Sequence, residues 1–227
     1  MPAGATARIV AMDGGPAQWP AFDAWRDQHP PTDPHLPCRA DDDVMQLYTS
    51  GTTGLPKGVV LENRNYSRFM QLATEVDGFA YEEGETVMIV MPLFHVAGTN
   101  VSFAGLAQGS RIVLVKDFTA ADAIRLLTEE QVAHAFLAPA MIQMMLQHPD
   151  AERGDYSALS SIAYGASPIA EAVLRGARST FGCRFVQFYG MTESTGGGSY
   201  LSPTAHDLPG KLTSCGKPWP GTEMAIL

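Results

Sequence analysis

From about residue 41 onward, short apolar runs alternate with segments that have helical periodicity. This alternation is typical of a largely parallel β-sheet with flanking helices, because parallel strands are usually joined by helical crossovers. Several runs are continuously apolar, as expected for strands covered on both faces. The expected strands are Val44–Tyr48, Val59–Leu61, Thr86–Met91, Arg111–Val115, Ala133–Leu137, Ser161–Tyr164 and Arg184–Phe188. We therefore predict an α/β fold.

Two of the expected helices carry start or stop signals, three signals in all. Thr119 is a natural N-cap residue, and an acidic residue stands three positions on at Asp122. Ser167-Pro168 has the form of a cap followed by proline at the first helical position, and Gly182 is the expected stop. The methionine-rich run from Ala138 to Gln147 also predicts a helix, whose methionines we expect to fill the core.

The first 43 residues differ from the rest of the chain. Arg8–Met12 could form a strand and Ala21–Gln28 a short helix. His29–Asp43 holds four prolines and three consecutive aspartates, which is typical of an exposed connector. We expect a peripheral segment over residues 1–43 and the core over residues 44–227.

Composition excludes several classes of function. The net charge of −9, with no cluster of Lys or Arg, argues against binding to nucleic acid. Cys38, Cys183 and Cys215 form neither a disulfide framework nor a zinc spacing, so we expect a cytoplasmic protein. The first fourteen residues do not resemble a signal peptide, and Val87–Val96 is too short for a transmembrane segment. The sequence leaves the oligomeric state open.

The segment from Thr49 to Gly58 has the clearest chemical character. Four hydroxyl side chains, three glycines and one lysine lie in ten residues that follow a strand-like run. Glycines allow the backbone to turn its N–H groups inward, and Lys57 supplies a charge for phosphate oxygens. A surface turn is the alternative, but the combination favours phosphate binding. A Walker A loop is excluded, because Pro56 precedes the lysine and Gly58 follows it.

Four further motifs follow in order, and all five together resemble the adenylate-forming superfamily, most closely its fatty acyl-CoA synthetases. The four are Pro92–Gly98, Tyr164–Pro168, Gln187–Ser194 and Gly216–Gly221. The resemblance covers roughly residues 41–227 and implies the central part of the large domain. Members of that superfamily also have an aspartate for the ribose, a hinge and a C-terminal domain with a catalytic lysine. None of these can be matched here, so we expect the isolated fragment to be inactive.

The resemblance implies an enzyme that uses ATP to activate a carboxylic acid, releases pyrophosphate, and then forms a thioester with CoA. ATP, Mg²⁺ and CoA are the implied cofactors and co-substrates, and the acid is expected to be fatty or otherwise hydrophobic. Two alternatives stay open. The chain could act only as a nucleotide- or acyl-binding module, or it could be an adenylation domain that feeds a carrier protein.

The resemblance also implies a role for individual residues. The catalytic residues would be Lys57, His95, Thr192 and Glu193, with Glu193 as the Mg²⁺ ligand. The nucleotide would be bound by Thr49, Ser50, Gly51, Thr52, Thr53, Gly54, Lys57, Gly165, Ala166, Ser167, Tyr189, Gly190, Met191 and Thr192. The acid would be bound by Phe94, His95, Val96, Phe188 and Gly196. Because these motifs follow strands, and ligands of open α/β sheets bind beyond the carboxyl ends of strands, we expect one shared crevice.

Structural alternatives exist for several of these residues. Glu193 could be a charge at a helix start, Tyr189 a half-buried aromatic residue, and Ser167 only a helix cap. His95 could be a buried core histidine, although the resemblance favours a position beside the substrate carboxylate. Phe188 departs from the glycine that many coumarate-ligase-like members have there, so it should narrow or reshape the acyl pocket.

Overall fold

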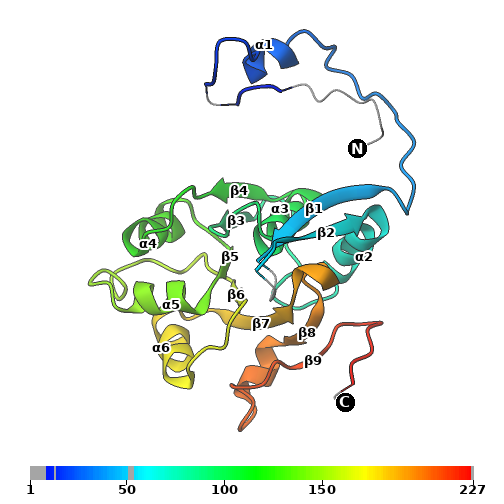
Figure 1. Ribbon diagram of the computed structural model, residues 1–227. Coiled ribbons are helices and arrows are strands. Elements are labelled where there is room, and N and C mark those ends of the chain that lie inside the picture. Colours follow the sequence, from blue (N-terminus) through cyan, green and yellow to red (C-terminus); the bar gives the residue numbers. More distant parts are fainter. Residues whose placement is uncertain (1–8, 13, 51–53, 226–227) are drawn as a thin grey trace. The chain divides into compact units, whose positions relative to one another are not determined.

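The computed structural model describes residues 9–12, 14–50 and 54–225 (Figure 1). The chain divides into two compact units, Met1–Cys38 and Arg39–Leu227. The smaller unit contains helix α1 (Phe22–Arg26), which lies within the expected helix, and an isolated bridge between Ala11 and Ala21. Everything that concerns the candidate site lies in the larger unit.

The larger unit is built around a seven-stranded sheet with the order β4-β3-β5-β6-β7-β8-β9. Its strands are β3 (Thr86–Ile89), β4 (Arg111–Leu114), β5 (His134–Leu137), β6 (Ser161–Gly165), β7 (Arg184–Gly190), β8 (Gly198–Leu201) and β9 (Lys217–Pro218). The first five in the spatial order are parallel, β8 pairs with β7 in antiparallel fashion, and β9 pairs with β8 in the same way. The predicted parallel α/β sheet is confirmed, whereas β8 and β9 were not expected.

Helices cover both faces of this sheet (Figure 1). The helices are α2 (Asn63–Ala73), α3 (Val96–Ala107), α4 (Ala120–Glu129), α5 (Pro139–Leu146) and α6 (Glu171–Phe181). Met88 of β3 packs in the hydrophobic core that includes α4, α5 and α6. Its neighbours Val87 and Ile89 pack in the other core, which includes α2 and α3. This alternation along one strand explains the continuously apolar runs. Among the described residues, no helix is long and apolar enough to cross a bilayer.

Two of the three predicted helix signals are confirmed. The Thr119 hydroxyl accepts a hydrogen bond from the Asp122 N–H at 3.0 Å, and Gly182 ends α6 in the left-handed conformation with φ 62°. The prediction that Ser167 caps α6 is wrong, because the N-cap is Ala170. The helix begins instead at Glu171, whose carboxylate in the first turn interacts favourably with the helix dipole.

The segment that carries Thr49 and Lys57 does not belong to the parallel sheet. Strands β1 (Asp43–Thr49) and β2 (Lys57–Glu62) form a separate antiparallel hairpin, which corrects the expectation of two further parallel strands. The physical reason is the short connection over residues 50–56, since a parallel crossover needs about a dozen residues or more. Leu47 and Leu61 of the hairpin pack against Tyr66 of α2.

Candidate functional site

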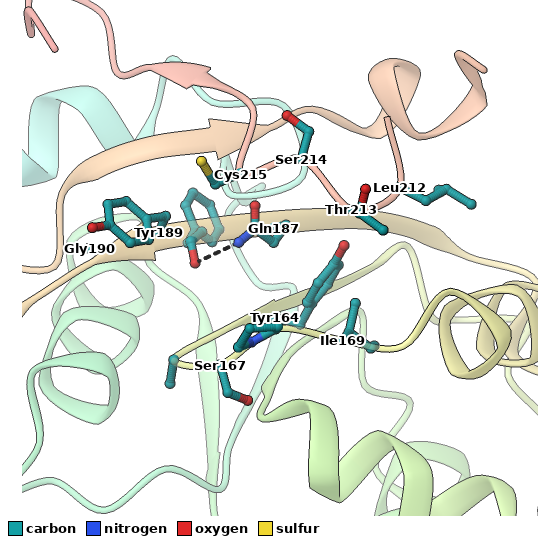
Figure 2. Close-up of a pocket in the computed structure, with 13 residues that line it drawn as sticks. Tyr164, Ser167, Ile169, Gln187, Tyr189, Gly190, Leu212, Thr213, Ser214 and Cys215 are labelled. Atoms are coloured by element: carbon teal, nitrogen blue, oxygen red, sulfur yellow. Dashed lines mark hydrogen bonds between the residues drawn. The ribbon is translucent and has the colours of Figure 1, made fainter. Parts of the chain in front are cut away.

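Two adjoining pockets lie where β6 and β7 end. The first, here called the β6–β7 pocket, has a volume of about 350 Å³. Figure 2 shows it between the loop after β6, which carries Ser167 and Ile169, and the 212–215 segment, with Gln187 of β7 between them. Tyr189, with half of its surface exposed, also lines this pocket.

The second pocket, here called the aromatic pocket, has a volume of about 90 Å³. Its wall is dominated by five rings, which belong to Phe69, Phe79, Phe136, Phe188 and Trp219. The Phe188 ring lies at the centre of this group, with its centroid 5.1 Å from that of Phe79 and 5.5 Å from that of Trp219. Phe188 thus occupies space within this group of rings, in line with the prediction that its side chain narrows the pocket, a prediction that stays to be tested.

Three residues line both pockets, namely Ala166, Phe188 and Gly190. The two pockets therefore share a wall. Ala166 has φ 67°, a left-handed conformation that costs a non-glycine residue energy and that tends to occur at functional sites. Beside it, a Cβ on Gly165 would lie 2.6 Å from the Phe188 carbonyl oxygen, so only glycine allows β6 and β7 to approach so closely here.

A tight turn follows β7 and contains the short 3₁₀ helix η1 (Thr192–Ser194). The Ser194 hydroxyl accepts from the Met191 N–H at 3.2 Å and donates to the Met191 carbonyl at 3.0 Å. The Asn100 side chain of α3 donates to the Thr195 carbonyl at 2.7 Å. The turn is thus fixed at both ends, with Thr192 half-buried and Glu193 exposed between them.

The phosphate-loop candidate begins at the end of the β1–β2 hairpin. Thr49 and Lys57 face each other as paired residues, and Lys57 is exposed. Ser50 is exposed and Gly54 has φ 85°, while Gly51, Thr52 and Thr53 lie outside the described residues. Strand β2 contacts η1, so the hairpin lies beside the Thr192–Ser194 turn.

The structure does not bring every predicted residue to a pocket. Val96, Phe188 and Gly196 line the aromatic pocket, but Phe94 and His95 do not. Phe94 is 70% exposed, and His95 is exposed at the N-terminus of α3, with the two ring centroids 4.9 Å apart. The exposure of His95 rules out the alternative of a buried core histidine.

Sequence reasoning missed much of the pocket walls. Asn100, Phe69, Phe79 and Phe136 of the aromatic pocket and the 212–215 segment of the β6–β7 pocket were not expected. Gln187 and Trp219 lie within the motifs but were not named as site residues. The aromatic residues have the spacing of ordinary core positions. Only the fold shows that their rings meet.

A metal site in this region would have to rest on few protein ligands. Among the described residues, no three His, Cys, Asp or Glu side chains gather in a way that could hold a metal ion. Glu193 is an exposed carboxylate on the fixed turn. One carboxylate with phosphate oxygens and waters is a donor set that suits Mg²⁺, so the residues present fit that ion.

Comparison with known proteins identifies the family of this chain. Residues 3–227 match the sequence model of the family described as AMP-binding enzyme. The chain belongs to this family. It is 36% identical over its whole length to the fatty acid–[acyl-carrier-protein] ligase ScoC of Streptomyces coeruleorubidus, of which it covers 43%. It is 33% identical over 82% of its length to the medium/long-chain-fatty-acid–CoA ligase FadD8 of Mycobacterium tuberculosis, of which it covers 32%.

Solved structures of AMP-binding enzymes and their relatives share the fold. The inhibitor-bound N-terminal domain of FACL13 from Mycobacterium tuberculosis superposes with a TM-score of 0.79 at 26% identity, covering 88% of this chain and 50% of that one. O-succinylbenzoate coenzyme A synthetase (MenE) from Bacillus subtilis, in complex with ATP and magnesium ion, gives 0.70 at 28% identity, covering 80% and 37%. The chain thus spans half or less of these relatives.

Proposed function

We propose that the protein carrying this chain activates a hydrophobic carboxylic acid with ATP and then transfers the acyl group to the thiol of CoA. The observation that carries the proposal is the shared wall of Ala166, Phe188 and Gly190. An aromatic pocket suited to an acyl chain and a larger, more polar pocket meet there. The reacting carboxylate and the α-phosphate of ATP would meet at this wall.

The first step joins two anions, so its main requirement is the neutralisation of charge. One carboxylate oxygen bonds to the α-phosphorus while the bond from that phosphorus to the bridging oxygen breaks, and pyrophosphate leaves. Such phosphoryl chemistry depends on positioning and electrostatics more than on covalent participation of the protein. The thiol sulfur then bonds to the acyl carbon, loses its proton, and AMP leaves.

Side chains on the hairpin and on the turn after β7, two segments that contact each other, suit these tasks. Lys57 at the hairpin would hold the leaving phosphates, and the Thr192 hydroxyl would donate to the α-phosphate. Glu193 would hold Mg²⁺, which when bound would neutralise phosphate oxygens. His95 lies at the start of α3, one residue before the pocket residue Val96, so substrate binding would have to turn its ring inward to reach the carboxylate.

The nucleotide base is assigned to the β6–β7 pocket. Its volume of about 350 Å³ lies at the lower end of the roughly 300–1,000 Å³ typical of small-molecule sites. The half-exposed Tyr189 ring offers a flat face for adenine, and Ala166 and Ser167 bring backbone and hydroxyl groups to the pocket rim. The alternative role of Ser167 as a helix cap has already been excluded by the start of α6.

A carrier protein is a second candidate for the thiol acceptor. The specific support is the similarity to the acyl-carrier-protein ligase ScoC, which extends over the whole of this chain. A free CoA thiol and a carrier-bound phosphopantetheine thiol present the same nucleophile, so the pockets described here would serve either one.

The test is exchange of labelled pyrophosphate into ATP by the intact protein, across a panel of hydrophobic acids. We expect exchange that depends on both an acid and Mg²⁺. Absence of exchange with every acid, together with retained binding of ATP, would favour the simple binding module instead. Thioester formation with free CoA and with a phosphopantetheine-loaded carrier protein then identifies the acceptor.

A further inference from the structure

Four of the rings that line the aromatic pocket touch one another in a closed cycle. The ring centroids are 6.1 Å apart for Phe69 and Phe79, 5.1 Å for Phe79 and Phe188, 5.5 Å for Phe188 and Trp219, and 5.7 Å for Trp219 and Phe69. We call these four residues the ring cycle. Aromatic rings in direct contact have centroid separations of about 4.5–7 Å. A ligand can therefore pass between two members of the cycle only by pushing them apart.

The ring cycle is firmly packed into the surrounding protein. Each of its members is between 3% and 8% exposed. Phe136 stacks on Phe188 with a centroid distance of 6.4 Å, and Tyr81 packs against Phe79 at 5.4 Å. Inserting further atoms into so closely packed an interior forces side chains out of their preferred rotamers and shifts the backbone. The cycle therefore closes the pocket on its side.

The space that remains in the pocket is short. A volume of about 90 Å³ holds about three groups the size of a water molecule, whose share of liquid volume is roughly 30 Å³. With the carboxylate at the shared wall, this leaves room for a chain of a few carbon atoms. A benzene ring adds six carbon atoms and exceeds that space.

We propose that the ring cycle limits the length of the acid, so that the substrate is a short-chain aliphatic acid of about four or five carbon atoms. The proposal rests on the proposed function and names its substrate class more closely. None of the described residues that line the aromatic pocket carries a charge, which suits an apolar chain.

The far side of the ring cycle offers no apolar continuation to a longer chain. Phe69 and Trp219 also line a separate hollow, and Arg64 and Arg68 lie in its wall. The Arg68 guanidinium donates to the Pro220 carbonyl at 3.2 Å, which holds it beside this hollow. Methylene groups that reached this charged surface would bury less apolar area than inside the pocket. Such a chain would not recover the cost of separating the rings.

The experiment is a chain-length series with the intact protein. The kcat/KM of pyrophosphate exchange is measured with acetic, propanoic, butanoic, pentanoic, hexanoic, octanoic and benzoic acids. Each methylene group that the pocket buries should raise this value about fourfold, so we expect the maximum at butanoic or pentanoic acid. Octanoic and benzoic acids should lie about tenfold or more below that maximum. A maximum at hexanoic, octanoic or benzoic acid would overturn the proposal.

Two variants test whether the ring cycle sets the limit. Phe79→Ala removes one ring of the cycle, and we expect the ratio of kcat/KM for octanoic acid to that for butanoic acid to rise about tenfold or more. Phe181→Ala is the matched control, because Phe181 is 2% exposed in the core on the other face of the sheet. It should keep the ratio of the unmodified protein.

The ratio of two acids is independent of how much of each variant is folded. Phe79→Leu removes less volume and should raise the ratio in the same direction, so it replaces Phe79→Ala if that variant does not fold. A ratio that stays unchanged when Phe79 is replaced would contradict the role of the ring cycle.

Failure of the two proposals can be told apart. Exchange that is fastest with the longer acids would overturn only the inference about chain length. No exchange with any acid of the series, nor with longer acids, would overturn the proposed function, and this inference with it.

Discussion

Lys57 and Glu193 lie on different elements, and each is exposed on its own. Neither side chain packs in the apolar core, so we expect both residues to contribute through their charge and position and not through packing. The contact between β2 and η1 brings their two segments side by side. Substitutions at these two positions should therefore change chemistry far more than stability.

Replacing Lys57 by alanine should lower pyrophosphate exchange by about a hundredfold or more, because one preorganised charge at the leaving phosphates is lost. The thermal midpoint should stay within about one or two degrees, as is usual for an exposed position. Lys116→Ala removes an exposed lysine after β4 and serves as the control. Equal rates of pyrophosphate exchange for the two variants would show that Lys57 does not take part in the reaction.

Glu193→Gln keeps the shape of the side chain and removes its charge. We expect the Mg²⁺ concentration needed for half-maximal exchange to rise and the rate to fall by about a hundredfold. A Mg²⁺ titration of exchange measures both. The matched control is Glu152→Gln, an exposed carboxylate elsewhere on the surface. An unchanged titration would show that Glu193 is only a surface charge.

Phe188→Gly should shift the acid preference towards bulkier substrates, because the ring fills the centre of the aromatic pocket. The loss of a buried ring also costs stability, about 3–5 kcal/mol. Phe185→Gly is a suitable control, since Phe185 is buried in the core on the opposite face of the same strand. The relative kcat/KM values across a panel of acids should change in Phe188→Gly and stay the same in Phe185→Gly.

At the scale of elements, the start of β5 and β6 contains a buried polar cluster away from the site. His134 is 2% exposed; its Nδ1 lies 2.7 Å from the Ser161 hydroxyl and its Nε2 2.8 Å from a Glu85 carboxylate oxygen. Burial lowers the pKa of His134, against the opposing effect of Glu85. The sequence-based expectation that this histidine is structural agrees with its lack of access to solvent.

The lowered pKa of His134 predicts how the stability of the fold depends on pH. The unfolded chain binds a proton at His134 near pH 6.5, whereas the folded protein does so only at lower pH, so acidification below about 6.5 favours unfolding. Urea unfolding at pH 8 and pH 5.5 should show this loss. His134→Gln should reduce this pH-dependent loss of stability. An equal loss in the two proteins would contradict the assignment.

The elements show why the sequence predicts some of this fold and not the rest. The parallel strands are continuous apolar runs, so composition alone locates them. Helix α3 (Val96–Ala107) is apolar along most of its length and has no polar face to reveal its period. Strand β8 begins with glycine, and β9 is a two-residue strand that ends in proline, so neither has a strand pattern.

At the scale of the whole molecule, the candidate site combines segments from Thr49 to Trp219. The motifs could be located in the sequence because each is a contiguous stretch with unusual chemistry. The aromatic wall was not, since its rings come from separate helices, strands and turns and have the spacing of core residues. These core residues line a pocket only because tertiary packing brings their rings together.

The wall that the two pockets share has a thermodynamic consequence. The Phe188 ring faces the aromatic pocket, while the backbone around it also borders the β6–β7 pocket. Under the proposed function, we expect an acid that displaces Phe188 to change the free energy of nucleotide binding. Linkage is reciprocal, so the nucleotide then changes the affinity for that acid by the same factor. Acids of different bulk should therefore be distinguishable by the affinity of the protein for ATP alone.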